Sequence, residues 1–283
     1  MNAIVTALNP QTLRRFRFPI LLVAMVAVLS ATRGINVLAE VHPIAALVAG
    51  LATSAAAIAG YTWLARRVEG REDVAEFDRK AMWSGLRRGT LIGFLCFTAT
   101  ILIIGMFGGW GRITAGSIGA FLTIAGSMTS VAVNEEILFR GVIYRILEER
   151  TGSVIAIVTS SVLFGLTHLV NENSTISGSL AIALAGGTLT ALSYVLTRSL
   201  WLPIGVHFAW NTTELGIFGT ATSGTEGVPG LFHLTMDPTA STTLTGGTFG
   251  PEASVVAMLV CLVPAVWMFR KARRDGLLRK RPF

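Results

Sequence analysis

The stretch SVAVNEEILFRGVIYRILEER, residues 130–150, decides how this chain folds. Most of it is apolar, yet Glu135 and Glu136 are adjacent, and Arg140 follows four residues after Glu136. A charged side chain at the centre of a bilayer costs about 2.5–3.5 kcal/mol on insertion scales, so such residues persist where they are paired or line a polar cavity. The stretch therefore predicts a membrane helix that carries a buried ionic site.

The composition agrees with a membrane protein. Of the 283 residues, 52% are hydrophobic and only 14% are charged, whereas soluble domains carry roughly 25% charged residues. The mean hydropathy is +0.64, and apolar runs close to the ~20 residues of a membrane helix recur along the chain. The eight candidate spans are about 18–39, 43–65, 89–109, 115–147, 153–170, 178–197, 201–218 and 253–270. The predicted fold is an all-α, polytopic bundle of about eight membrane helices.

The positions of Lys and Arg predict the orientation of the bundle. With a cytoplasmic N-terminus, all but two of the 23 basic residues lie on the cytoplasmic side, the exceptions being Arg33 and Arg112. Both termini are therefore expected to be cytoplasmic. Topology and attraction to anionic lipids explain the net charge of +7, so the expected partner is the bilayer and not nucleic acid. The excess of Arg over Lys favours a multi-pass protein of a bacterial cytoplasmic membrane.

We predict a single integral-membrane domain over residues 1–283, with its functional core at about 115–218. The cytoplasmic insert at about 66–88 mixes both charge signs with apolar residues, which is typical of an amphipathic surface helix or of a solvated loop. The outer loop at about 219–252 is rich in Gly and Thr. It is expected to be irregular, and its composition fits either a lid or a connector.

The charged residues of the opening stretch are expected to differ in role. Glu136 and Arg140 are four residues apart on a helix, with the glutamate first, which is the favourable order for an ion pair. Glu135 points about 100° away from Glu136 around the helix. The spacing therefore predicts that Arg140 holds one carboxylate and leaves the other free.

Two further predicted spans supply polar partners at helical spacing. His168 lies near the end of one span, and His207 and Asn211 are four residues apart in another. At a rise of about 1.5 Å per residue, Glu135 and His168 are predicted at matching depths of roughly 20 Å. His207 is predicted at a shallower depth, unless the turn at 198–201 is itself drawn into the membrane.

These residue types fit hydrolysis. A carboxylate in a dry site can take a proton from water, an imidazole can move protons or bind a metal, and an amide N–H can stabilise an oxyanion. The sequence contains no HExxH or GxSxG motif and no Asp within a span, so other intramembrane protease chemistries lack their residues. The alternative is a non-catalytic membrane protein: a transporter or proton relay, or a bacteriocin-immunity or scaffold protein. The absence of an internal repeat counts against a transporter.

Three short motifs carry a resemblance. EEILFR (135–140), FGLTH (164–168) and HFAWN (207–211) fit the patterns EExxxR, FxxxH and HxxxN. In this order, and in separate spans, they resemble the CAAX protease and bacteriocin-processing family of intramembrane proteases. The resemblance implies an intramembrane endopeptidase of the glutamate or metallo type that cleaves a membrane-associated or CaaX-like peptide. In eukaryotic members the substrate is the C-terminal tripeptide of a prenylated protein.

The resemblance also assigns roles to the first two motifs. It implies that Glu135 is the general base that activates the attacking water and that His168 shares this water. Glu136 and Arg140 would be the orienting ion pair.

For the third motif, the resemblance implies that His207 and Asn211 stabilise the tetrahedral oxyanion. A metal ion is an open alternative, since Glu135, His168 and His207 would suit zinc. The metal-free mechanism, in which Glu135 and His168 alone bind the water, is preferred.

Overall fold

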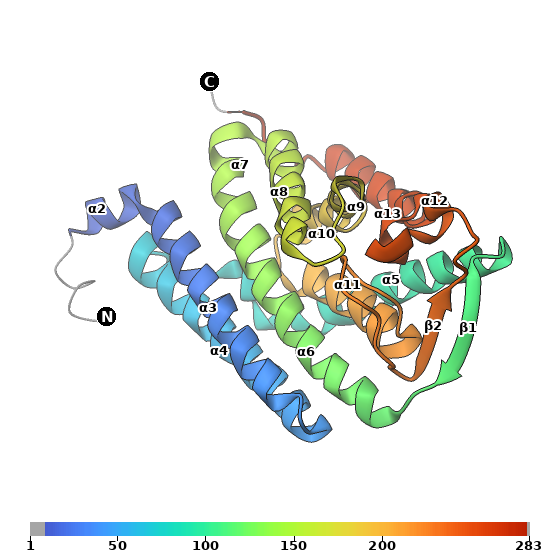
Figure 1. The fold of residues 1–283 in the computed structure, drawn as a ribbon. Helices are drawn as coiled ribbons and strands as arrows, with labels where there is room; N and C mark the ends of the chain where they lie inside the picture. The colour runs from blue at the N-terminus through green and yellow to red at the C-terminus, as the bar shows by residue number, and fades with distance from the viewer. Residues whose placement is uncertain (1–8, 282–283) are drawn as a thin grey trace.

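The predicted fold class is confirmed by a computed structural model that describes residues 9–281: the chain is an all-α, polytopic membrane bundle (Figure 1). Within this range, six helical runs are long and apolar enough to cross a membrane. They are Arg17–Ala39, Pro43–Glu69, Arg79–Met106, Ser153–Val170, Ile176–Thr197 and Val255–Arg274. Many apolar side chains of these helices face outward, among them Val23 and Val263, as expected of helices surrounded by lipid. The count of eight spans stays a prediction, as does the side of the termini, which lie outside the described residues.

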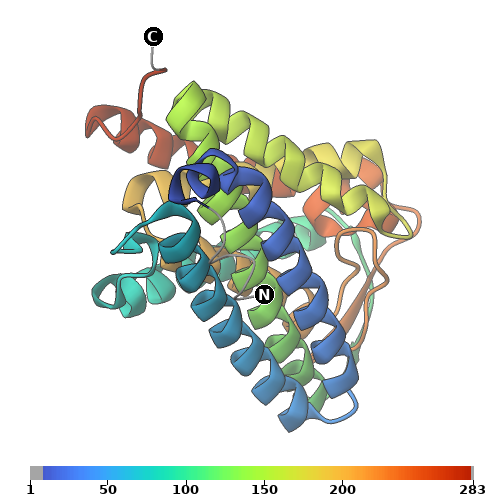
Figure 2. The ribbon, with the colours of Figure 1, turned by 90° about the vertical axis from the view of Figure 1, so that its left-hand side faces the viewer.

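Helices α3 (Arg17–Ala39) and α4 (Pro43–Glu69) form an antiparallel pair on one side of the molecule, preceded by the short α2 (Pro10–Arg15). Both pack against α6 (Ile118–Glu136), and the three run side by side in Figures 1 and 2. Gly50 of α4 and Gly126 of α6 meet where these two helices are closest. A Cβ atom on Gly50 would lie 2.0 Å from the carbonyl oxygen of Gly126, so the close approach depends on glycine.

The predicted surface helix at 66–88 is not formed, and the segment is not an extended solvated loop. Instead, α4 continues to Glu69 and α5 begins at Arg79 and ends at Met106, with the 3-10 turn η1 (Ala75–Phe77) between them. Gly70, at a φ of +68°, ends α4, and the Asp78 side chain accepts a hydrogen bond from the backbone of Lys80 at the start of α5. Local end signals thus divide the segment between two membrane helices.

Among the described residues, three helices contain π-helical segments. These are η2 (Ile137–Tyr144) between α6 and α7 (Arg145–Thr151), η4 (Ala183–Gly187) between α9 (Ile176–Ile182) and α10 (Thr188–Thr197), and η5 (Thr212–Phe218) after α11 (Trp201–Asn211). Two of these composite helices correspond to the predicted spans 115–147 and 201–218. Such segments shift the register of a helix by one residue and occur frequently at functional sites.

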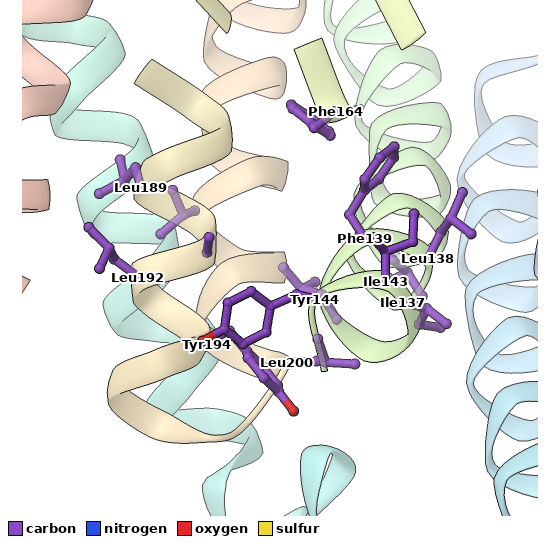
Figure 3. Close-up of a cluster of buried hydrophobic side chains, with 14 of the residues drawn as sticks. Ile137, Leu138, Phe139, Ile143, Tyr144, Phe164, Leu189, Leu192, Tyr194 and Leu200 are labelled. Carbon is purple, nitrogen blue, oxygen red and sulfur yellow. The ribbon is translucent and has the colours of Figure 1, made fainter. Parts of the chain in front are cut away.

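The core lies where η2 meets α10 and α8 (Ser153–Thr167), which is followed by the 3-10 turn η3 (His168–Val170). Figure 3 shows this cluster of buried side chains. The rings of Phe139 and Phe164 stack edge to face at 5.1 Å, and those of Tyr144 and Tyr194 at 5.5 Å. Helix α13 (Val255–Arg274) packs on α10 and α5. The π-helical segment that follows the two glutamates is therefore firmly packed.

The prediction of a wholly irregular outer loop at 219–252 is wrong. Its strand β2 (Phe232–Met236) pairs antiparallel with β1 (Trp110–Ala115), as seen in Figure 1. Leu234, opposite Ile113 in the sheet, is buried and anchors the loop to the bundle. Short helical turns complete the loop: α12 (Thr242–Thr245), η6 (Gly247–Phe249) and η7 (Pro251–Ala253). Pairing with a distant segment orders a loop whose composition alone is typical of irregular structure.

Candidate active site

Glu136 holds two partners at the end of α6. Its side chain is fully buried, and its Oε1 accepts a hydrogen bond from Arg140 Nη1 at 3.1 Å, which confirms the predicted ion pair. The same oxygen lies 3.0 Å from His207 Nδ1. Because the carboxylate paired with Arg140 accepts, Nδ1 of His207 donates the proton in this contact. Glu136 therefore orients an imidazole as well as a guanidinium.

Arg140 connects this pair to a second helix. Its Nη2 donates to the carbonyl oxygen of Gly187 at 2.9 Å, at the end of η4. Its guanidinium also lies 4.8 Å from the centre of the Phe164 ring, a cation–π contact with α8. The side chain is completely buried, and its charge is tolerated because it is paired with Glu136 and hydrogen-bonded to Gly187.

Glu135 occupies a different position from Glu136, as predicted from its place on the helix. Its side chain is 22% exposed, and its Oε2 lies 3.9 Å from Nε2 of His207. That separation is longer than a direct hydrogen bond, but it is short enough for one water molecule to contact both atoms. His207 is thus placed between the two carboxylates, with one ring nitrogen facing each.

His168 and Asn211 line a cavity of about 40 Å³ together with His207. The ring of Phe164 separates the two imidazoles, at 5.0 Å from His168 and 5.7 Å from His207. Nδ1 of His168 lies 2.8 Å from the Phe164 carbonyl oxygen, so its Nε2 is left as the nitrogen available to a ligand. In the described part of the chain, Glu135 comes within 4.0 Å of a ring nitrogen of His207 but not of His168. The predicted pairing of Glu135 with His168 would therefore need water or substrate between them.

Of the two alternatives for the depth of His207, the structure supports the one in which the turn at 198–201 is drawn inward. The contact with Glu136 places His207 at the level of the two glutamates. The turn before α11 is drawn into the protein: Leu200 is fully buried and its backbone N–H donates to the Glu76 carbonyl oxygen at 2.9 Å. Arg198 adopts the left-handed conformation, with φ of +52°, which makes the turn tight. Because α11 begins inside the protein, counting residues from its end underestimates the depth of His207.

Glu252 also lines this cavity, a position that the motifs did not indicate. Its side chain is 7% exposed and accepts hydrogen bonds from the backbone N–H and the hydroxyl of Ser223, at 2.5 and 2.7 Å. Ser223 has a φ of +52°, a left-handed conformation that is uncommon for residues other than glycine. The same loop is fixed beside His168, since Asn173 donates to the Gly224 carbonyl oxygen at 2.8 Å. The loop at 219–252 is therefore a wall of the cavity.

The predicted metal ligands do not form a metal site. Across residues 9–281, no three His, Cys, Asp or Glu side chains converge in a way that could hold a metal ion. A zinc site needs three or four ligands at about 2.0–2.3 Å, whereas among the described residues Glu135 approaches His207 and no carboxylate oxygen comes within 4.0 Å of His168. The residues as arranged do not fit a metal ion.

Comparison with known proteins shows which family the site segment is similar to. Residues 117–213 match the family model described as Type II CAAX prenyl endopeptidase Rce1-like. This segment is therefore similar to the CAAX protease family. A Bacillus subtilis (strain 168) protein described as "Putative membrane peptidase YdiL" is 36% identical over 78 residues, which are 28% of this chain. The match spans 30% of that protein's length. No solved structure matches the chain.

The family segment contains the predicted site residues, from Glu135 to Asn211, and ends before the loop that carries Glu252. The resemblance stated from the three motifs is therefore confirmed. The motifs gave no signal for Glu252; a single acidic residue directly before an apolar span is the only hint in the sequence. The three π-helical segments could not be predicted from the motifs either, although each lies beside a site residue or the wall of the cavity.

Proposed function

We propose that this protein is an intramembrane endopeptidase that hydrolyses a peptide bond through a water molecule activated by Glu135. The observation that carries the proposal is the position of His207 between two carboxylates: Glu136 fixes its Nδ1, and Nε2 faces Glu135 across 3.9 Å. This arrangement provides a partly exposed base next to an oriented imidazole. The membrane peptidase to which the chain is similar supports the same class of reaction.

The proposed reaction begins when Glu135 takes a proton from a water molecule beside His207. The water oxygen then forms a bond to the carbonyl carbon of the substrate, which becomes tetrahedral and carries a negative charge on its oxygen. The C–N bond breaks, and the nitrogen takes up the proton held by Glu135. The products are a carboxylic acid and an amine, and no covalent enzyme intermediate forms.

His168, His207 and Asn211 line the cavity in which the oxyanion would develop. An amide N–H or an imidazole N–H directed at that oxygen stabilises the transition state more than the ground state. We assign this role to the Asn211 amide and to Nε2–H of His207 in its doubly protonated form, because Nδ1–H of His207 is already donated to Glu136. We assign to His168 the second contact with the water or with the leaving group. Glu136 and Arg140 act as positioning residues, because Glu136 contacts His207 and Arg140 contacts Glu136, and neither contacts the reacting atoms.

The proposed substrate is a membrane-associated or CaaX-like peptide that reaches this cavity from the bilayer of a bacterial cytoplasmic membrane. Apolar residues such as Ile182, Leu189 and Val206 line the cavity beside its few polar groups. Such a lining suits an extended peptide with apolar side chains, because the polar groups are then reserved for the scissile bond.

The test is cleavage of fluorogenic CaaX-type and membrane-helix peptides by the purified protein in detergent. Wild type is compared with Glu135→Gln and with the control Glu172→Gln, an exposed glutamate shortly after His168. We expect Glu135→Gln to lower kcat by about 10²–10⁴-fold, the typical contribution of a general base, and Glu172→Gln to retain wild-type activity. Equal cleavage by wild type and Glu135→Gln, or no cleavage of any peptide by wild type, would contradict the proposal.

A further inference from the structure

Two neighbouring membrane helices each carry one polar stripe. In α3 and α6 these polar residues recur every three or four positions, so each set lies on one face of its helix. The stripes consist of Thr32, Arg33, Asn36 and Glu40 in α3, and of Ser127, Ser130, Asn134 and Glu135 in α6. Because the two stripes line one cavity between the helices, they indicate a polar boundary inside the bundle.

A cavity of about 200 Å³ lies between the two helices and is lined by both stripes. One water molecule needs roughly 10–15 Å³ of such space, so the cavity has room for several. It is distinct from the cavity that contains His168 and Asn211, since these two residues do not line it. Glu135 belongs to this second cavity, and we name it the α3–α6 groove.

Two amide oxygens in the groove lack partners. Asn36 and Asn134 are nearly fully buried, and in the described part of the chain the side-chain oxygen of each accepts no hydrogen bond. Their nitrogens are satisfied: Nδ2 of Asn36 donates to Thr53, and Nδ2 of Asn134 donates to the Ser130 carbonyl oxygen at 2.9 Å. A buried acceptor without a partner costs about 1–3 kcal/mol. Water in the groove would remove this cost.

The groove leads from a membrane face to Glu135. Glu40, at the exposed end of α3, accepts a hydrogen bond from the Ser127 hydroxyl at 2.7 Å. Ser127 precedes Glu135 by eight residues of α6, or about 12 Å at 1.5 Å per residue. Figures 1 and 2 show α3 and α6 side by side along this length. One end of the groove is thus at the turn between α3 and α4, and the other is at the partly exposed Glu135 carboxylate.

We propose that the α3–α6 groove is a hydrated passage that admits water to Glu135 from the membrane face at the α3–α4 turn. The use of this water in hydrolysis rests on the proposed function, whereas the hydration of the groove does not. The peptide and the water then approach from different sides: the peptide occupies the cavity with His168 and Asn211, and the water arrives beside Glu135. His207 lies at the boundary between the two.

Hydration is tested by the reactivity of single cysteines. Val131 and Met128 are half-buried residues that line the groove, and Gly34 is an exposed residue of α3 at which an added side chain meets open space. Gly34 lies two residues before Asn36, which places it on the opposite, lipid-facing side of α3, about 200° away. Its depth matches that of Val131, because Thr53 contacts both Asn36 of α3 and Ser130 of α6, and Gly34 and Val131 lie within two residues of these. Val131→Cys, Met128→Cys and Gly34→Cys are therefore a matched set.

Each full-length variant, in sealed proteoliposomes, is treated with a small, permanently charged methanethiosulfonate on one face at a time. Thiols react as thiolates, which need water. We expect Val131→Cys and Met128→Cys to react at least tenfold faster than Gly34→Cys when the reagent is on the face of the α3–α4 turn. The native Cys96 and Cys261 are buried, so wild type serves as the blank.

Reaction at Val131→Cys and Met128→Cys as slow as at Gly34→Cys, in variants that elute as monodisperse wild-type-like protein, would overturn the proposal. Faster reaction from the opposite face would also overturn it. Fast labelling in a protein that cleaves no peptide would retain the hydrated groove and remove the proposed function. Slow labelling in a protein that cleaves peptides would overturn the hydrated groove and retain the proposed function.

Discussion

His207 and Glu136 form a buried contact of 3.0 Å between residues 71 positions apart in the chain. Glu136 thereby joins α6 to α11 and fixes which nitrogen of His207 remains available. The adjacent Glu135 takes no part in this contact and is partly exposed. The two neighbouring carboxylates therefore differ in role. The inner one, Glu136, binds Arg140 and His207, and the outer one, Glu135, is available to water.

The inner carboxylate is expected to contribute much more to stability than the outer one. Glu136→Gln leaves the buried Arg140 guanidinium without its counter-charge, which typically costs about 3–5 kcal/mol. Glu135→Gln alters a partly exposed group that is 3.9 Å from its nearest ionic partner, and should change the free energy of unfolding by about 1 kcal/mol or less. Reversible denaturation of both variants in detergent measures the difference. Similar losses for both would show that the two glutamates are not divided in this way.

The sequence was sufficient for those features that depend on short-range spacing. The Glu136–Arg140 pair is four residues apart on one helix, so helical geometry alone predicts it. The separate orientation of Glu135 follows from the same geometry. The membrane fold class follows from composition and from the lengths of the apolar runs, which the bilayer thickness dictates.

Features that depend on tertiary packing could not be predicted. His207 meets Glu136 because the turn around Leu200 is buried, and the depth estimate assumed that this turn lies at the membrane surface. Glu252 reaches the cavity because a strand of its loop pairs with β1, more than a hundred residues earlier. The π-helical segments arise from packing around the site and have no distinctive residue pattern.

Glu252 is expected to act as a positioning residue for the cavity beside His168. Glu252→Gln weakens the charge-assisted hydrogen bonds from Ser223, and a loss of about 1.4 kcal/mol in the transition state corresponds to a tenfold lower kcat/KM. The control is Glu226→Gln, an exposed residue of the same loop, which should behave as wild type. The pH profile of kcat/KM is measured for all three proteins. If Glu252→Gln had the wild-type pH profile, kcat and KM, Glu252 would have no role in positioning the site.

The loop between α4 and α5 is expected to make stability sensitive to acid. Burial alone would raise the pKa of Glu76. The hydrogen bonds and the positive charge of Arg71 lower this pKa by more than burial raises it, so the pKa of Glu76 lies below the ordinary value of 4.5. Arg71 Nη1 and Nη2 donate to the two carboxylate oxygens at 2.7 and 2.5 Å. A lowered pKa contributes stability that is present above pH 4.5 and is lost as the pH falls through the folded-state value.

Glu76→Gln should therefore be less stable than wild type at pH 7, and its melting temperature should fall less steeply between pH 5 and pH 3. Glu72→Gln, an exposed neighbour in the same loop, is the control and should follow the wild-type curve. Thermal unfolding in detergent across this pH range provides the measurement. A parallel decline in all three proteins would mean that Glu76 does not contribute to the acid response.

The contact between α4 and α6 is expected to depend on Gly50 of α4 and not on Gly60, about three turns later in the same helix. A Cβ on Gly50 would lie 2.0 Å from the Gly126 carbonyl oxygen, whereas a Cβ on Gly60 of the same helix meets nothing within 4 Å. Gly50→Ala must push α4 away from the helix that carries Glu135, at a cost of about 1–3 kcal/mol. Gly60→Ala should be within about 0.5 kcal/mol of wild type. Denaturation of the two variants in detergent compares them directly, and equal stability would mean that α4 and α6 are not in the close contact described above.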